Sequence, residues 1–162
     1  MRRHCLAGTA VLLFVSISAV VLAKDSKSSP PPPDRDPFVG IWRANGDKSQ
    51  PKLNKVEGSY TRTVRRIGED IVFSSAGGAA GAKIREHRFR CDGKFYPLPT
   101  GPVMSCRWLN SSSVEGETHL PDGRKDYWVT EVTPDGRMMT ITAFKDKART
   151  KIASIMILDR IE

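Results

Sequence analysis

The sequence predicts an all-β protein whose antiparallel up-and-down strands close into a barrel of about eight to ten strands. Short runs rich in β-branched and aromatic residues recur along the chain, tight-turn residues separate them, and no segment shows a convincing helical period. In the turns Pro121-Asp122-Gly123 and Pro134-Asp135-Gly136, proline presets the first turn residue and glycine accepts a positive φ. A sheet closed on itself buries a modest core and leaves no open edge.

The N-terminus predicts an export signal over residues 1–23. Arg2 and Arg3 precede an uncharged apolar run, Leu6 to Leu22, and the small residue Ala23 ends a segment of the kind that signal peptidase cleaves. An uncleaved membrane anchor is the alternative, although small and polar residues within the run weaken it as a membrane span. We therefore expect an exported protein, periplasmic or secreted after cleavage near Ala23.

A linker over residues 24–36 follows the signal. It is rich in serine and charge and contains four consecutive prolines, Pro30 to Pro33, which favour an extended spacer. The folded domain is expected over residues 37–162. Cleavage would leave 139 residues, the size of one domain, and would remove two of the 26 basic residues and none of the 18 acidic ones, leaving a net charge of +6.

The strand candidates are bounded by turn residues and carry β-formers in alternation. The last of them contains an apolar, β-branched stretch, Ile152 to Leu158, which favours a buried final strand over a helix. In chain order the expected strands are residues 38–44, 59–67, 70–75, 83–90, 94–98, 103–109, 112–119, 125–132, 137–145 and 151–161.

Two of the three cysteines, Cys91 and Cys106, remain after signal cleavage. An even pair in an oxidising compartment predicts one disulfide. It would close a loop of about 15 residues, which the chain-entropy model values at roughly 3 kcal/mol. A redox or metal-binding pair is the alternative, but Cys-x-x-Cys spacing and a nearby histidine are both missing.

Motifs for catalysis, metals and cofactors are missing from the sequence. His87 and His119 show no zinc-ligand spacing, no serine lies in a Gly-x-Ser-x-Gly elbow, and the glycine-rich segment 77–81 lacks the end of a phosphate loop. We therefore predict no catalytic residue, no metal, no cofactor and no enzymatic activity. Export and scattered basic residues argue against nucleic-acid binding, and we expect a monomer.

Ligand binding is the function that remains. Arg62, Arg88 and Arg107 lie on expected middle strands, where inward side chains would bind a carboxylate or phosphate head group. An apolar tail would contact Phe89, Trp128, Met138 and Met139. Alternation equally permits the arginines to face solvent.

Two functions are therefore open. The first is a barrel that binds a small, partly apolar ligand. The second is a cell-envelope interaction module, whose filled barrel would present its basic outer face to a protein or an anionic polymer. An open interior cavity of a few hundred Å³ would support the first function and a filled core the second.

The run Phe38-Val39-Gly40-Ile41-Trp42 resembles the Phe-x-Gly-x-Trp first strand of the lipocalin and fatty-acid-binding barrels, the calycins. With Lys48-Ser49 and the segments 90–97 and 135–142, it resembles a largely uncharacterised family of small exported bacterial lipocalin-like proteins, over residues 37–162. The resemblance implies a lipocalin-like barrel and structural roles for Phe38, Gly40, Trp42 and Arg160.

In calycins the tryptophan closes one barrel end and an arginine of the last strand packs over it, so the resemblance implies that Arg160 stacks on Trp42. The chain departs from the fatty-acid-binding proteins at residues 45–57, which are too short and too interrupted for a helix pair. The lid and ligand-clamping residues of that group therefore cannot be carried over.

Overall fold

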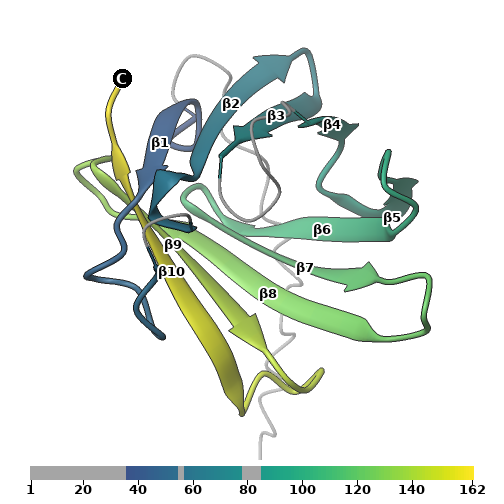
Figure 1. Cartoon of the computed structure of the whole chain (residues 1–162). Coiled ribbons are helices and arrows are strands. Elements are labelled where there is room, and N and C mark those ends of the chain that lie inside the picture. The colour runs from purple at the N-terminus through teal and green to yellow at the C-terminus, as the bar shows by residue number, and fades with distance from the viewer. Residues whose placement is uncertain (1–35, 55–56, 78–84) are drawn as a thin grey trace, which may run out of the picture.

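Ten antiparallel strands form one sheet that curls into a nearly closed barrel (Figure 1). The computed structural model describes residues 36–54, 57–77 and 85–162, so the expected signal and nearly all of the expected linker lie outside the described residues. The elements are β1 (Gly40–Ala44), the 3-10 turn η2 (Glu57–Ser59), β2 (Thr61–Ile67), β3 (Asp70–Ala76), β4 (Arg85–Phe89), β5 (Asp92–Pro97), β6 (Val103–Asn110), β7 (Ser113–His119), β8 (Lys125–Val132), β9 (Met138–Phe144) and β10 (Ile152–Arg160).

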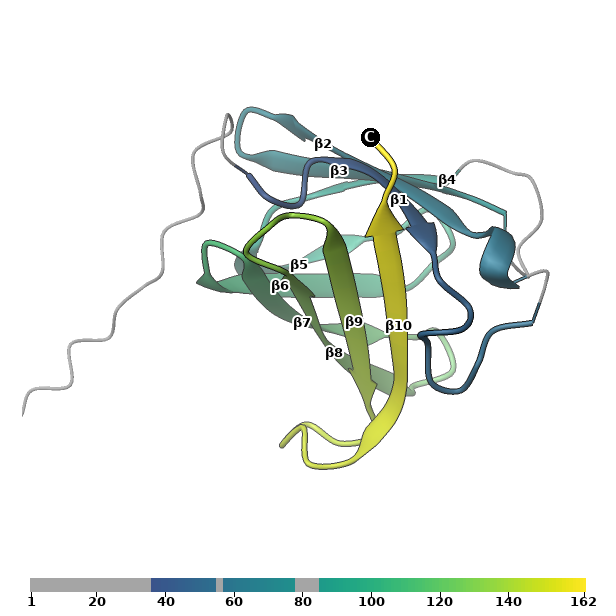
Figure 2. The same ribbon diagram turned by 90° about the vertical axis from the view of Figure 1, so that its left-hand side faces the viewer.

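The strand order β4-β3-β2-β1-β10-β9-β8-β7-β6-β5 makes every connection between neighbours antiparallel. Pairing of the first strand with the last, with Trp42 opposite Arg160, joins the two halves of the chain and curls the sheet into the barrel. Figure 2 shows β9 and β10 side by side and β1 continuing the wall beyond β10. The strands β4 and β5 end the order, and no backbone ladder joins them within the described part of the chain.

The predicted all-β fold is confirmed, with ten strands. Each strand lies at a predicted run, and its ends fall within two residues of the predicted ends. The agreement has a physical basis, because Gly68, Gly123 and Gly136 adopt the positive φ that the turns between strands require. Among the described residues, the one element that the sequence did not predict is the short η2.

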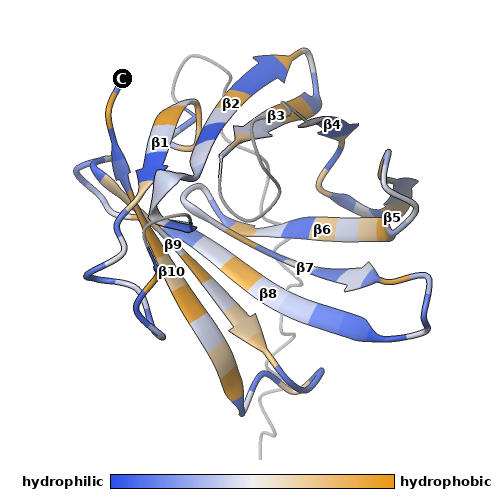
Figure 3. Cartoon of the chain, viewed as in Figure 1, coloured by the Kyte–Doolittle hydropathy of each residue, from blue (hydrophilic) through white to orange (hydrophobic). Residues whose placement is uncertain are grey.

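Alternation divides each strand between the barrel interior and the outer surface, as the banded colouring of several strands indicates (Figure 3). On β6, Met104, Cys106 and Trp108 are buried, whereas Arg107 between them is exposed. The main apolar core is continuous from Phe38 through Trp108 to Leu158.

The segment before β1 closes one end of the barrel, which we call the capped end. The even-numbered strands end at this side of the barrel. Phe38 packs edge-on against Trp108 with ring centroids 5.5 Å apart. The Trp42 indole is fully buried and donates a hydrogen bond from Nε1 to the Phe38 carbonyl oxygen at 2.9 Å. This contact fixes the segment 38–42 beneath the barrel.

Residues 45–54 cover the outer face of β10. Gln50 forms an isolated bridge with Ile155, and the buried Ser49 hydroxyl accepts a hydrogen bond from the Ile157 amide. Ile157 is thereby buried although it faces away from the interior. No helix among the described residues is long and apolar enough to cross a membrane.

Candidate functional site in the barrel interior

The barrel interior contains a cavity of about 450 Å³. It extends from Phe38 and Trp108 at the capped end to Asp126 and Ala143 near the opposite end. Strands β2, β3, β4, β6, β7, β8 and β9 contribute to its wall. The lining residues are Phe38, Arg62, Val64, Ile71, Phe73, Phe89, Cys91, Met104, Trp108, Val114, Thr118, Asp126, Tyr127, Trp128, Thr130, Met139, Ile141 and Ala143.

Most of the wall is apolar because inward positions on neighbouring strands align in register. Val64 pairs with Phe73, Ile71 pairs with Phe89, and Trp108 pairs with Val114. Aromatic rings dominate this wall, with Phe73 and Phe89 packed edge to face at 5.5 Å. Such a surface favours an apolar group in the cavity by the hydrophobic effect.

Arg62 supplies a cation to this apolar cavity. Its Nε donates to the Tyr60 hydroxyl at 2.9 Å, and that hydroxyl lies 3.1 Å from the Ser75 hydroxyl. The Arg62 guanidinium carbon also lies 4.8 Å from the centroid of the Phe73 ring. These contacts hold the guanidinium in place, and no carboxylate of the described residues forms an ion pair with it.

The strands β7 and β8 contribute a more polar wall. Trp128 donates a hydrogen bond from Nε1 to the Thr118 hydroxyl at 3.3 Å, so its indole is oriented within the cavity. Gly116 lies directly against that ring, and a Cβ at this position would collide with the indole and with the Ser105 carbonyl oxygen. The absence of a side chain at Gly116 therefore makes room for Trp128.

Four of the seven residues predicted to bind ligand line the cavity, namely Arg62, Phe89, Trp128 and Met139. The structure places Arg88, Arg107 and Met138 outside the cavity lining. Neighbours on a strand point to opposite faces, so an inward Phe89 turns Arg88 outward, and an inward Met139 turns Met138 outward. Arg107 lies between the buried Cys106 and Trp108 and faces out for the same reason.

The two outward arginines have carboxylate partners. Arg88 contacts Asp70 at 2.6 Å, and Arg107 contacts Glu115 at 2.5 Å. Their side chains are 59% and 70% exposed, so neither is available to a ligand in the interior.

Several lining residues were missed by the sequence-based prediction. The alternation Met104, Cys106, Trp108 against Ser105 and Arg107 carried the signal for Trp108, because apolar and polar residues alternate there without exception. The inward orientation of Val64, Ile71 and Val114 follows from the same alternation once the orientation of one other residue on each strand is known. No comparable signal marked Asp126 and Tyr127, which begin β8 among charged residues.

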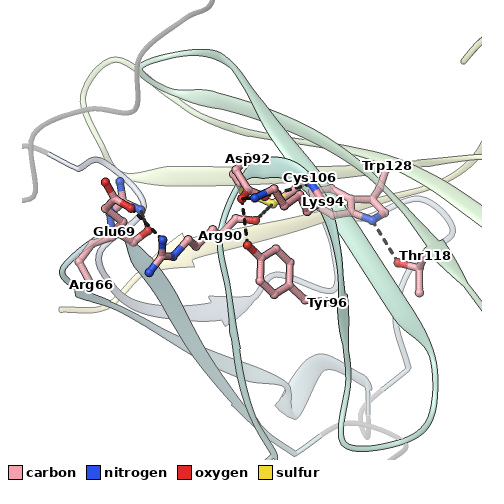
Figure 4. The surroundings of a disulfide bond; sticks show 10 residues. Arg66, Glu69, Arg90, Asp92, Lys94, Tyr96, Cys106, Thr118 and Trp128 are labelled. Carbon is pink, nitrogen blue, oxygen red and sulfur yellow. Dashed lines mark hydrogen bonds and ion pairs between the residues drawn. A yellow bond between two sulfur atoms is a disulfide. The ribbon is translucent and has the colours of Figure 1, made fainter.

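The predicted disulfide joins Cys91, between β4 and β5, to Cys106 in the middle of β6. Cys91 also lines the cavity. Figure 4 shows Tyr96 pointing toward Asp92 beside this bond, and the Tyr96 hydroxyl donates to the Asp92 carboxylate at 3.0 Å. The covalent link therefore joins the strand β6 to the junction of β4 and β5, where the barrel wall lacks a backbone ladder.

A buried ion pair lies at the capped end. Asp36 Oδ2 is 2.9 Å from Arg66 Nε, and the two side chains are 1% and 7% exposed. Burial raises the pKa of the Asp36 carboxyl above its ordinary value, while the Phe38 amide and Arg66 oppose that shift. The Arg66 guanidinium lies 5.3 Å from the centre of the Trp108 indole, so the pair packs beneath the cavity floor.

The part of the chain that the structure describes contains no group of three or more His, Cys, Asp or Glu side chains that could hold a metal ion. Among the described residues, the interior instead offers one guanidinium, several hydroxyls, the Asp126 carboxyl near the end opposite the capped end, and an aromatic wall. This arrangement can bind a molecule with one anionic group and one apolar portion.

Comparison with solved structures shows the same fold. The Schistosoma mansoni fatty acid binding protein in complex with arachidonic acid matches with a TM-score of 0.54 and 14% identity, covering 78% of this chain and 97% of that chain. The REP1-NXSQ fatty acid transporter matches with a TM-score of 0.55 and 13% identity, covering 76% of this chain and 96% of that chain. The fluorescent protein UnaG matches with a TM-score of 0.52 and 13% identity, covering 76% of this chain and 96% of that chain.

These similarities show the class of fold, a ten-stranded antiparallel barrel like that of fatty-acid-binding proteins. No protein-family model matches the sequence. No curated protein matches it either. At identities of this order the comparison establishes the barrel architecture, and a function must be argued from the cavity.

Proposed function

We propose that this protein is an exported carrier that holds a small amphipathic ligand in the barrel, with an anionic head group at Arg62. The observation that carries the proposal is the interior cavity, whose wall is apolar and aromatic except for a guanidinium and a few hydroxyl-bearing or acidic residues. Its volume of about 450 Å³ falls within the roughly 300–1,000 Å³ of small-molecule sites.

The arrangement of the lining supports an orientation for this ligand. Arg62 lies toward the beginning of β2, whereas Phe38 and Trp108 form the floor at the capped end. A carboxylate or phosphate at Arg62 would gain a charge-assisted hydrogen bond. The apolar tail would then extend toward Trp108 and Met104.

Two neighbours support the small apolar ligand by the names they carry, a fatty acid binding protein bound to arachidonic acid and a fatty acid transporter. The alternative of an envelope interaction module requires a filled barrel, and the cavity does not favour it. Export follows from the character of residues 1–23 and is tested by the N-terminal mass of the protein recovered from its own host.

Displacement of a bound fluorescent probe tests the ligand class. The probe is anilinonaphthalene sulfonate, and the competitors are decanoate and decanol, which share a ten-carbon chain and differ in charge. We expect decanoate to compete more strongly, and Arg62→Met to weaken decanoate by about tenfold or more while leaving decanol nearly unchanged. The matched control is Arg65→Met, on the same strand but exposed and paired with Glu86.

Equal competition by decanoate and decanol would overturn the anionic head group. Failure of the probe and of both competitors to bind would overturn the carrier function itself. Native mass spectrometry of the protein isolated without refolding provides an independent measurement, since a retained ligand adds a mass that disappears on denaturation.

A further inference from the structure

A second cavity, of about 290 Å³, lies on the outer face of the barrel. We call it the outer pocket, and it is bounded by the outward side chains of β6, β7 and β8 and by the loop 145–151 between β9 and β10. Its lining differs sharply from the interior, since it carries Arg107, Glu115, Glu117, Lys147 and Arg149. The outer pocket is therefore a site for a charged group.

The loop 145–151 is built around Asp146. The Asp146 carboxylate accepts hydrogen bonds from the Thr150 amide, the Thr150 hydroxyl and the Lys151 amide, at 3.2, 2.8 and 2.8 Å. Its carbonyl oxygen accepts a hydrogen bond from the Arg149 amide at 3.0 Å. These bonds hold Arg149 at a φ of 56°, a left-handed conformation that residues other than glycine rarely adopt. The fold thus maintains a costly backbone geometry that directs Arg149 over β8 to β7.

Cations outnumber the carboxylates that neutralise them. The Glu115 side chain is 9% exposed and lies between two guanidiniums, with Arg107 at 2.5 Å and Arg149 at 3.0 Å. Lys147 adds a third cation to the lining, while Glu117 lies 3.1 Å from His119. The lining therefore carries three cations, Arg107, Lys147 and Arg149, against two carboxylates, Glu115 and Glu117.

Arg149 also has an unused donor. Its Nε is buried and has no acceptor among the described residues. Buried guanidinium donors are nearly always hydrogen-bonded, because leaving one without an acceptor forfeits its hydration. An oxygen anion in the outer pocket would contact the accessible part of the Arg149 guanidinium, which is 26% exposed, and a small rotation of the side chain would bring Nε to it. The anion would also reduce the excess positive charge of the lining.

We propose that the outer pocket binds a small oxyanion, a carboxylate or a phosphate, independently of the ligand in the interior. The Arg149 guanidinium supplies directional donors suited to planar or tetrahedral oxyanions, and Lys147 supplies a compact charge. Carboxylates and phosphates would both be recognised in this way, and titration with malonate and with inorganic phosphate distinguishes them.

The test is titration of the intact, ¹⁵N-labelled protein with inorganic phosphate and, separately, with malonate, followed through amide and arginine Nε–H resonances. The Lys147→Gln variant removes one cation, and Arg149→Gly removes the guanidinium while suiting the positive φ of the loop. The matched control is Arg124→Gln, an exposed arginine paired with Asp122 outside the pocket. Spectral dispersion and thermal unfolding show that each variant remains folded.

We expect saturable shifts confined to residues 105–117 and 145–151, and affinity weakened by about tenfold in Arg149→Gly and severalfold in Lys147→Gln. Arg124→Gln should stay within about twofold of the parent protein. Saturation by phosphate alone or by malonate alone identifies the source of the oxyanion. Absence of saturation with both probes, or equal weakening in the Arg124 control, overturns the site.

Discussion

The Arg160 guanidinium stacks on the Trp42 indole, with its central carbon 4.3 Å from the ring centroid, and the two residues are partners in the β1–β10 ladder. Three backbone carbonyl oxygens accept its donors, those of Gly136 at 2.5 Å, Val39 at 2.6 Å and Pro37 at 2.5 Å. Burial lowers the pKa of Arg160 from its ordinary value. One side chain therefore joins the last strand, the β8–β9 turn and the segment that closes the capped end.

Arg160→Lys should lower the free energy of unfolding by about 2–3 kcal/mol. The planar guanidinium donates to three carbonyl oxygens in different directions, and the compact lysine ammonium cannot replace all three hydrogen bonds. Urea unfolding followed by tryptophan fluorescence measures the change. Arg43→Lys, at an exposed site on β1, is the matched control and should change stability by less than about 0.5 kcal/mol. A loss of equal size in both variants would contradict the role assigned to Arg160.

Gly116→Ala tests the close approach of β7 to Trp128. The added methyl group would collide with the indole and with a backbone oxygen, so we expect a loss of about 1–3 kcal/mol and weaker binding of an interior probe. Gly58→Ala is the control, since nothing lies within 4 Å of a Cβ there. Thermal unfolding and probe titration provide the two readouts. If the Gly116 variant unfolds at the parent temperature and binds the probe normally, the indole is not confined as described.

The disulfide should matter both for stability and for the wall between β4 and β5. Replacing Cys91 and Cys106 together by serine should cost about 3 kcal/mol, as expected for a cross-link that spans 15 residues. Hydrogen exchange should accelerate most in β4 and β5, because the cross-link holds their junction against β6. Uniform acceleration across all strands would show that the bond acts on the unfolded chain alone.

Asp70 should contribute to acid sensitivity. Hydrogen bonds from Arg90 and Arg88 lower the pKa of its carboxyl below the ordinary value of 3.8. The folded protein therefore holds this proton less tightly than the unfolded chain, so the stabilisation is present above pH 3.8 and is lost as the pH falls further. Asp70→Asn should be less stable than the parent protein at pH 7, and the difference should shrink below pH 3.8.

Chemical denaturation at a series of pH values measures this difference. Asp47→Asn, at an exposed position, is the control and should track the parent protein throughout. A difference between Asp70→Asn and the parent protein that persists unchanged into strong acid would rule out the ion pairs as its source.

The strands could be predicted from the sequence because turn chemistry is local. Glycine at the turns and alternation between them fix where each strand begins and ends. Which face of a strand points into the barrel is harder to predict where both faces carry large side chains. In β9 the outward Met138 and inward Met139 are chemically identical, and their orientation depends on the register that pairs Met139 with Leu158 in the neighbouring strand β10.

The candidate site was therefore predicted in part. Arg62 faces inward because its strand places Val64 and Arg62 on one face, whereas Arg88 and Arg107 alternate with buried Phe89 and Trp108. Long-range contacts such as the Asp36–Arg66 pair join residues far apart in the chain, and no local pattern indicates them.

The break in the ladder between β4 and β5 has a consequence for assembly. Both strands expose one row of backbone donors and acceptors, the feature through which sheet proteins join end to end into aggregates. Here the two rows belong to consecutive strands that meet at Cys91. One edge is short, and the other carries Lys94, Pro97 and a register shift after Asp92. In the part of the chain that the structure describes, these two edges offer a second molecule no long regular strand to extend, which opposes edge-to-edge aggregation.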